Sequence, residues 1–248
     1  MTISTHYEKQ AISVDCVIFG FDGTNLKVLL TKRKDSMGSS VTVGDYKLPG
    51  SLISNEETID DAVKRVLTKY LGESDIFMRQ LEVFSDPNRI SPIELNWLNK
   101  YYNSDIKRVL TVAYYSLVKL EAKKPINNEG IWQNVDDVKC LALDHNTILI
   151  NALTVITNQI QREPIAFELL AKEFTIKELR VLYEAILGVE LDSRNFRKKM
   201  LGAGYITITQ KKEKGVSHKP AMYYRFNKRK YLLDVNERNK INFLNLNR

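Results

Sequence analysis

The sequence contains few of the residues that mark membrane, secreted or zinc-binding proteins. No apolar run approaches the roughly eighteen residues of a membrane-spanning helix. The first residues, MTISTHYEKQ, lack the basic and apolar regions of a secretory signal. Only two cysteines are present, Cys16 and Cys140, both in apolar surroundings, together with three scattered histidines. We therefore expect a cytoplasmic protein with two reduced core thiols, no structural disulfide, no metal site and no cofactor.

Positive charge is concentrated in the last third of the chain. The 248 residues are 44% hydrophobic and 27% charged, as in ordinary globular proteins, and their net charge is +7. Residues 162–248 contain 19 Lys and Arg against 10 Asp and Glu, whereas residues 1–161 contain 18 against 20. This asymmetry predicts a near-neutral first unit and a basic second unit that meets a polyanion. A basic tail that only confers solubility is the alternative.

Strand and helix patterns are mixed in residues 1–161, which indicates an α+β or α/β class. Apolar residues spaced three and four apart predict a helix at 56–71, and a second helix is expected at 146–161. A polar and aromatic stretch at 91–108 is expected to contain a short helix. Runs of β-branched and aromatic residues predict strands at 12–21, 26–32, 78–84, 109–119 and 131–135. The first two strands would form a hairpin around Asp22-Gly23.

The pattern changes after Glu163-Pro164, because the residue before a proline is driven out of helical geometry. Thr175 and Glu178 form a capping-box pair at the start of one predicted helix, and Gly188 would end it. Three short helices followed by a β-hairpin are the outline of a winged helix-turn-helix. The predicted helices cover 165–173, 176–187 and 194–201, and the hairpin strands cover 205–212 and 221–228. The expected domains are residues 1–161, 162–233 and a tail at 234–248.

The third of these helices has the composition of a DNA recognition helix. With Phe196 and Met200 turned to the core, its remaining side chains would face solvent. Arginine pairs with guanine, asparagine with adenine, and lysine neutralises phosphates. The predicted DNA contacts are Arg194, Asn195, Arg197, Lys198 and Lys199 on the helix, and Lys211, Lys212, Lys214, His218 and Lys219 on the wing. A solvated basic helix, or an RNA-binding or adaptor surface, is the alternative. Operators are usually read by two-fold dimers, so we expect a homodimer on double-stranded DNA.

Residues 49–72, PGSLISNEETIDDAVKRVLTKYLG, resemble the signature of the Nudix family. That signature is a glycine, five residues, Glu, seven residues, Arg-Glu, an aliphatic residue, one residue, Glu-Glu, one residue and Gly. In this chain Ser51 takes the place of the first glycine, and Glu57, Arg65, Leu67 and Gly72 occupy matching positions. The resemblance implies an α+β fold, with an N-terminal α/β/α sandwich around a mixed sheet.

Three glutamates of that signature are replaced by Val66, Lys69 and Tyr70. The family uses these carboxylates to hold the Mg²⁺ that neutralises a diphosphate and activates water. Asp60 and Asp61 lie about two turns or more upstream of the missing ligands, too far to replace them. We therefore predict a pocket kept for binding, with no catalytic residue. His145 has no nucleophile beside it and is expected to make a fixed hydrogen bond. A Mg²⁺-dependent Nudix hydrolase with an accessory basic domain is the alternative.

Nearly the whole chain resembles transcriptional regulators that join a degenerate Nudix domain to a winged helix. The likeness is carried by VDCVIFGF, DDAVKRVL, VAYYSL and LALDH, and above all by EPIAFELLAKEFTIKELRVLYEAI and DSRNFRKKM. One branch of these regulators senses ADP-ribose and controls NAD metabolism, and another senses a sugar such as L-arabinose. This chain resembles the sugar-responsive branch more closely. The resemblance implies a repressor that a small effector, a sugar such as L-arabinose or else ADP-ribose, releases from DNA. The effector contacts that we predict are Tyr46, Glu57, Arg65, Arg89 and Arg108.

One segment near the expected pocket departs from the family pattern. Where these regulators have Asp-Arg-Asp-Pro, this chain has the sequence NRISP at 88–92, followed by about fifteen inserted residues at 93–107. The insert contains Trp97, Tyr101 and Tyr102. Aromatic faces suit a sugar or a nucleobase, so the insert is a candidate wall of the pocket. Packing at a dimer interface or over the core is the alternative.

Overall fold

The computed structural model describes residues 10–33, 44, 46–73, 75–120, 129–213, 215 and 220–234. Its main sheet is built around β1 (Gln10–Phe21) and β6 (Arg108–Lys119), which run parallel from the Gln10–Arg108 pair to the Phe21–Lys119 pair. The main path of the sheet has the order β3 (Tyr46–Lys47), β2 (Leu26–Lys32), β1, β6 and β5 (Phe77–Phe84). In addition, β4 (Gly50–Leu52) pairs with β1, and β7 (Gly130–Asn134) pairs with β2. All these pairs except β1–β6 are antiparallel, so the sheet is mixed, as predicted.

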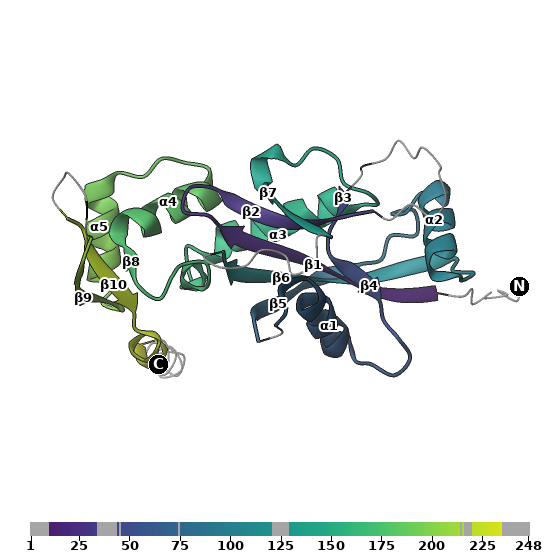
Figure 1. The fold of residues 1–248 in the computed structure, drawn as a ribbon, viewed down its shortest axis with the longest axis horizontal. Helices are drawn as coiled ribbons and strands as arrows, with labels where there is room; N and C mark the ends of the chain where they lie inside the picture. Colours follow the sequence, from purple (N-terminus) through teal and green to yellow (C-terminus); the bar gives the residue numbers. More distant parts are fainter. Residues whose placement is uncertain are drawn as a thin grey trace, which may run out of the picture.

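Helices α1 (Ile59–Leu71) and α3 (His145–Gln159) lie on opposite sides of this sheet (Figure 1). The alternation of side chains along β1 explains the two layers. Cys16 and its even-numbered neighbours pack in the hydrophobic cluster that contains the apolar face of α1. Val17 and Phe19 pack in the cluster that contains the apolar face of α3. The residues form an α/β/α sandwich, which confirms the predicted fold class.

The helix α1 begins and ends where its sequence provides caps. The Thr58 hydroxyl accepts from the Asp61 N–H at 3.2 Å, and the Asp61 carboxylate accepts from the Thr58 N–H, which closes a capping box. Gly72 ends the helix with a φ of 75°, a left-handed conformation that glycine adopts without strain. The predicted helix is therefore present but starts three residues later than expected.

The inserted segment forms the helix α2 (Pro92–Tyr102), capped by Ser91 and Glu94. Its Trp97 and Leu98 are buried against Ile106 and the start of β6. The buried Glu94 carboxylate also accepts from the Leu143 N–H at 2.6 Å, which ties α2 to the segment before α3. The insert is thus an integral part of the first unit.

The basic unit has the elements of a winged helix. They are the 3₁₀ turn η2 (Ile165–Glu168), β8 (Phe174–Thr175), α4 (Ile176–Leu187), α5 (Ser193–Gly202), β9 (Ile206–Lys212) and β10 (Met222–Phe226). The capping box of Thr175 and Glu178 and the left-handed Gly188 at the end of α4 are present, as predicted. The predicted helix at 165–173 is wrong beyond its first turn. Residues 169–173 form turns and bends instead, and they lead into β8, which pairs with β10. Residues 228–234 form a short α-helix that we did not predict.

One hydrophobic cluster continues from the first unit into the second. It includes Ala152 and Ile156 of α3, Ile165 and Phe167 of η2, and Leu179 of α4. The domain boundary at 161 and 162 stays a prediction, since this core crosses it. Figure 1 shows α2 and α5 at opposite ends of the molecule, with α3 between them.

Cysteine placement corrects one expectation. Cys16 is buried and free, as predicted, but Cys140 is free and exposed rather than in the core. Its apolar neighbours Leu141 and Ala142 are buried instead. Within the described part of the chain, no helix combines the length and the apolar run needed to cross a membrane.

Candidate functional site

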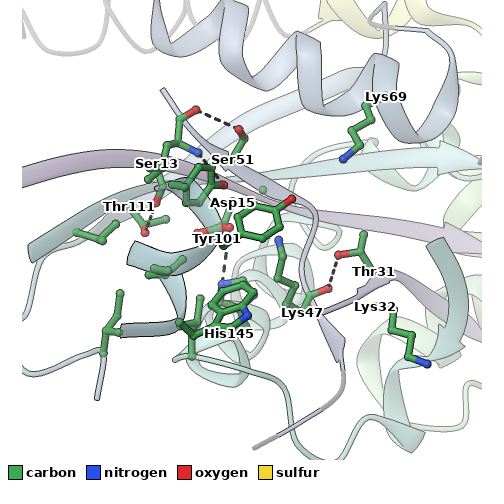
Figure 2. A pocket seen from close by; sticks show the side chains of 18 of the residues that line it. Ser13, Asp15, Thr31, Lys32, Lys47, Ser51, Lys69, Tyr101, Thr111 and His145 are labelled. Atoms are coloured by element: carbon green, nitrogen blue, oxygen red, sulfur yellow. Dashed lines mark hydrogen bonds and ion pairs between the residues drawn. The ribbon is translucent and has the colours of Figure 1, made fainter. Parts of the chain in front are cut away.

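A hollow opens where β1, β3, β4 and β6 meet the helix α2 (Figure 2). Its cavity volume is about 60 Å³, and the space among its lining residues reaches about 770 Å³ only when the open mouth is counted. Polar side chains from the sheet form its floor, and aromatic side chains from α2 form one wall. The lining includes Ser13, Asp15, Lys32, Lys47, Lys69, Arg89 and Thr111, together with Trp97, Tyr101, Tyr102 and His145. Concave sites that combine apolar walls with a few polar groups are where small molecules bind.

Asp15, Lys47 and His145 meet on the floor of the hollow, although 130 residue positions separate the first from the last. Asp15 lies on β1 directly opposite Gly50 of β4. A side chain at Gly50 would place its Cβ 1.9 Å from Asp15 Oδ1, so glycine is required for this close approach. Burial raises the pKa of the Asp15 carboxyl, and the nearby Lys47 and Arg89 oppose this rise. Burial also lowers the pKa of the Lys47 ammonium.

His145 is fully buried and held in one tautomer. The Leu48 N–H donates to Nδ1 at 2.8 Å, so Nδ1 carries no proton and the proton of the neutral ring is on Nε2. Nε2 lies 3.7 Å from Asp15 Oδ1 and has no hydrogen-bond partner among the described residues. Burial lowers the pKa of His145 to about 3, and the positive charge of Lys47 adds to this effect. The prediction of a fixed hydrogen bond is confirmed, and the ring is neutral at physiological pH.

Replacing His145 with asparagine is expected to flatten the acid side of the pH–stability profile. Between the ordinary pKa of 6.5 and the folded pKa of about 3, the unfolded chain binds a proton that the folded chain does not. The stability supplied by neutral His145 is complete above pH 6.5 and decreases toward acid by up to about 1.4 kcal/mol per pH unit. Asparagine keeps an acceptor for the Leu48 N–H but does not titrate. Urea unfolding of both proteins at several acidic pH values measures the difference. Parallel profiles would contradict it.

Arg89 lies in the segment before α2 and lines the hollow. Most of its N–H groups donate hydrogen bonds to other residues of the protein. Its Nε and NH2 donate to the two carboxylate oxygens of Asp144 at 2.7 and 2.6 Å. Its NH1 donates to the Thr111 hydroxyl and to the Phe84 carbonyl. Four of its five N–H groups are therefore occupied. Arg89 lines the hollow, but it acts mainly as a brace between β6 and the residue that precedes α3.

The other predicted effector contacts lie outside the lining of the hollow. Arg65 and Glu57 bind each other through two hydrogen bonds, and Arg65 also donates to the Ser51 hydroxyl at 3.0 Å, at the rim. Those bonds from Arg65 lower the pKa of Glu57 to about 2. Tyr46 packs against the larger core, and Arg108 donates to the Ser85 carbonyl at 2.6 Å. Nothing places these four side chains against a ligand, so their roles stay predictions.

The positions that hold the metal ligands in the Nudix signature do not fit Mg²⁺ here. Val66 and Tyr70 are buried in the core between α1 and the sheet. Lys69 instead forms an ion pair with Glu129 at 3.4 Å, and its ammonium lies 5.0 Å from the centre of the Tyr70 ring. Glu57, the matching glutamate, is bound by Arg65. Among the described residues, no group of three or more His, Cys, Asp or Glu is placed to hold a metal. Mg²⁺ requires several oxygen ligands in octahedral geometry, which this arrangement does not offer.

The helix α5, predicted to read DNA, presents its basic side chains to solvent. Phe196 and Met200 of α5 are buried, as predicted, while Arg194, Asn195, Arg197, Lys198 and Lys199 are exposed. On the wing, Lys211 and Lys212 are exposed on β9, and Lys211 also pairs with Glu173 at 3.1 Å. Lys214, His218 and Lys219 lie outside the described residues. The exposed faces of α5 and β9 can therefore meet a polyanion, and the individual DNA contacts stay predictions.

Sequence reasoning missed the polar floor of the hollow, Ser13, Asp15, Lys47 and Thr111. A signal was present in β1, because Ser13 and Asp15 interrupt an otherwise apolar strand on the same face as Val17. Ser13 and Thr111 lie opposite each other in the β1–β6 pair, and their hydroxyls are 2.7 Å apart. Polar residues on one face of a buried strand indicate a site at that end of the sheet.

The sequence of this chain is similar to the sequences of known transcriptional regulators. Residues 166–226 match the family model of the NrtR DNA-binding winged helix domain. A curated protein of Acinetobacter baylyi, the ADPR responsive transcriptional repressor NtrR, is 25% identical over 227 residues, covering 89% of this chain and 83% of its own length.

Two solved structures agree over most of the chain. NrtR of Shewanella oneidensis, crystallised with a 27mer DNA, superimposes with a TM-score of 0.69 at 23% identity, covering 87% of this chain and 93% of its own. A MutT/nudix family protein of Enterococcus faecalis gives a TM-score of 0.64 at 25% identity, covering 91% of this chain and 89% of its own. The chain thus has the fold of a Nudix-type domain followed by an NrtR-type winged helix. This confirms the resemblance inferred from the sequence.

Proposed function

We propose that this chain is a transcriptional repressor that binds a double-stranded DNA operator through α5 and the wing, in the cytoplasm and as a homodimer. The match of residues 166–226 to a DNA-binding winged helix domain carries this proposal. The exposed basic face of α5 supplies the physical support, since arginine and asparagine read bases and lysine neutralises phosphates. A two-fold dimer would place two copies of α5 in successive major grooves.

The effector that we propose is ADP-ribose or a close nucleoside diphosphate derivative. Arg89 is neutralised by Asp144, so the lining of the hollow offers three further cationic side chains, from Lys32, Lys47 and Lys69, against the carboxylates of Asp15 and Glu129. A diphosphate can satisfy this excess of positive charge, whereas a neutral pentose cannot. The Acinetobacter repressor is named for its response to ADPR, which supports the same choice. L-arabinose, which the sequence favoured, has no support from the relatives described above.

We infer that α3 couples the hollow to the DNA-binding unit. This helix starts at His145 on the floor and is about 22 Å long, from its fifteen residues. At its far end, the Thr157 hydroxyl donates to the Ile186 carbonyl of α4 at 3.2 Å. Just beyond α3, Glu163 pairs with Arg79 of β5 at 2.7 Å. A ligand that shifts the floor would therefore displace α4 and change the spacing of two α5 helices in a dimer.

ADP-ribose is expected to weaken binding to the specific operator by about 5- to 150-fold, the range of ordinary allosteric coupling. Fluorescence anisotropy measures this on duplexes tiled from the DNA upstream of the gene, with random duplex as competitor. L-arabinose, other pentoses and ribose 5-phosphate serve as comparison effectors. Release by L-arabinose and not by ADP-ribose would reverse the choice of effector. Binding without preference among duplexes, unaffected by every compound, would contradict the repressor proposal.

We also propose that the Nudix-type domain does not hydrolyse its ligand, because Val66, Lys69 and Tyr70 cannot hold Mg²⁺ as carboxylates do. In the same samples, supplemented with Mg²⁺, ADP-ribose is expected to remain intact by chromatography. Enzyme-dependent appearance of AMP and ribose 5-phosphate would establish the hydrolase alternative.

A further inference from the structure

We propose that Asp15 and His145 form a donor–acceptor pair on the floor of the hollow that binds one sugar hydroxyl of the effector. This inference rests on the proposed function, because it concerns the ligand of the same hollow, but it requires neither a base nor a phosphate. Both side chains line the hollow. The fixed orientation of each and the gap between them support the proposal.

The imidazole of His145 provides the donor of this pair. Its Nδ1 accepts from the Leu48 N–H, so the proton of the neutral ring is on Nε2. Nε2 is buried, has no hydrogen-bond partner among the described residues, and lies 3.7 Å from Asp15 Oδ1. A buried N–H without a partner costs free energy, and most such groups in folded proteins are satisfied. This N–H is therefore positioned for an acceptor that a ligand can supply.

The Asp15 carboxylate provides the acceptor and is held from the other side of the gap. The Thr111 hydroxyl, which accepts from Arg89 NH1, forms a hydrogen bond with this carboxylate. Burial raises the pKa of the carboxyl, whereas Lys47, Arg89 and the Thr111 hydroxyl favour its charged form. These contacts orient Asp15 without involving the ring of His145.

The gap between the two groups matches one oxygen atom. At 3.7 Å, Nε2 and Oδ1 are too far apart for a direct hydrogen bond. An oxygen placed beside both can lie about 2.8 Å from each, which is an ordinary hydrogen-bond length. The cavity volume of about 60 Å³ has room for a few water-sized groups, enough for a hydroxyl and the carbon that carries it. Figure 2 shows His145 directed at Asp15 on the floor of the hollow.

A hydroxyl is the ligand group that satisfies both partners. It accepts from the Nε2–H of His145 and donates its own proton to the carboxylate of Asp15. A phosphate oxygen or a carbonyl can only accept, and a phosphate is also repelled by Asp15. An ammonium can only donate, which leaves the N–H of His145 unpaired. Because His145 is the first residue of α3, a bound hydroxyl also connects the ligand to the helix that we propose to carry the signal.

Calorimetric titration of the full chain at neutral pH with two series of ligands tests the proposal. One series is ADP-ribose with analogues that each lack one ribose hydroxyl, and the other is L-arabinose with analogues that each lack one hydroxyl. One analogue is expected to bind about 10- to 150-fold more weakly than its parent, the range for one hydrogen bond to a charged group. The series in which this loss occurs identifies the source of the hydroxyl.

Two variants test whether Asp15 and His145 cause that loss. His145→Asn keeps an acceptor for the Leu48 N–H but removes the donor, and Asp15→Asn keeps the shape but removes the charge. The ratio of parent to analogue affinity is expected to fall by about 2- to 10-fold in His145→Asn and by about 10-fold in Asp15→Asn. The ratio is the quantity to compare, because the lost charge of Asp15 affects parent and analogue alike. Lys32→Gln is the matched control, since it removes a charge that lines the hollow outside the pair, and it should leave the ratio unchanged.

Thermal melting shows whether each variant folds, and the ligand series on the unmodified chain needs no variant. The pair is overturned if no single hydroxyl matters in either series, if both variants keep the ratio of the unmodified chain, or if Lys32→Gln lowers the ratio equally. If ADP-ribose still binds and releases the operator, the proposed repressor function stands without the pair. A loss confined to the L-arabinose series keeps the pair and replaces the effector. If neither parent ligand binds, the effector and the pair are both wrong.

Discussion

Replacing Arg89 with alanine is expected to lower the free energy of unfolding by about 3–5 kcal/mol, the range for breaking a buried ion pair. The side chains of Arg89 and Asp144 are only 5% and 14% exposed. Removing the guanidinium leaves the Asp144 carboxylate buried without a cation, and it also deprives the Phe84 carbonyl and the Thr111 hydroxyl of a donor. Urea unfolding followed by circular dichroism measures the loss.

Two further variants define what that loss means. Lys107→Ala removes one member of an exposed pair, in which Lys107 and Asp105 are 51% and 73% exposed, and should cost no more than about 1 kcal/mol. Arg89→Lys keeps the charge but cannot form the two parallel bonds to Asp144, so we expect an intermediate loss. If Arg89→Ala were no more destabilising than Lys107→Ala, the brace between β6 and the start of α3 would be unimportant. The proposed coupling through α3 would then lose its support, because it requires Arg89 to hold the start of α3 at the hollow.

Most of the fold could be predicted from the sequence because its signals are local. The turn at Asp22-Gly23 and the apolar strands beside it specify the hairpin of β1 and β2 without reference to the rest of the chain. Thr175, Glu178 and Gly188 likewise specify both ends of α4. Where the signal was not local, prediction failed. Nothing within residues 165–173 reveals that Phe174 must pair with a strand about fifty residues later.

The candidate site was less predictable for the same reason. Asp15, Lys47 and His145 meet only because the sheet brings β1 and β3 beside the first turn of α3. The family signature directed attention to Glu57 and Arg65, which bind each other at the rim. The insert was recognised as a possible wall, but its aromatic side chains could not be placed before α2 was seen to pack against β6. When the residues of a site come from distant segments, the sequence of any one segment gives little indication of the site.

Replacing Arg197 with alanine is expected to weaken specific operator binding by about 1–3 kcal/mol, the value of one base-reading arginine. Arg197 is exposed on α5, and its NH2 donates to the Tyr224 hydroxyl of β10 at 3.1 Å. Tyr224 is buried, so this bond fixes the direction of the guanidinium before DNA arrives. Anisotropy titrations on the operator and on random duplex, each at several salt concentrations, separate base reading from phosphate attraction.

Lys198→Ala is the matched control for that experiment, because Lys198 is the exposed neighbour of Arg197 on the same helix. A phosphate-binding lysine should weaken operator and random duplex equally and reduce the salt dependence by about one counterion. Tyr224→Phe should fall between the unmodified protein and Arg197→Ala, since it removes the bond that orients the guanidinium and leaves the charge. If Arg197→Ala weakened both duplexes equally, Arg197 would be a phosphate contact. Base reading would then fall to Arg194 and Asn195, which lie nearer the N-terminus of α5, the end that contacts bases in such helices.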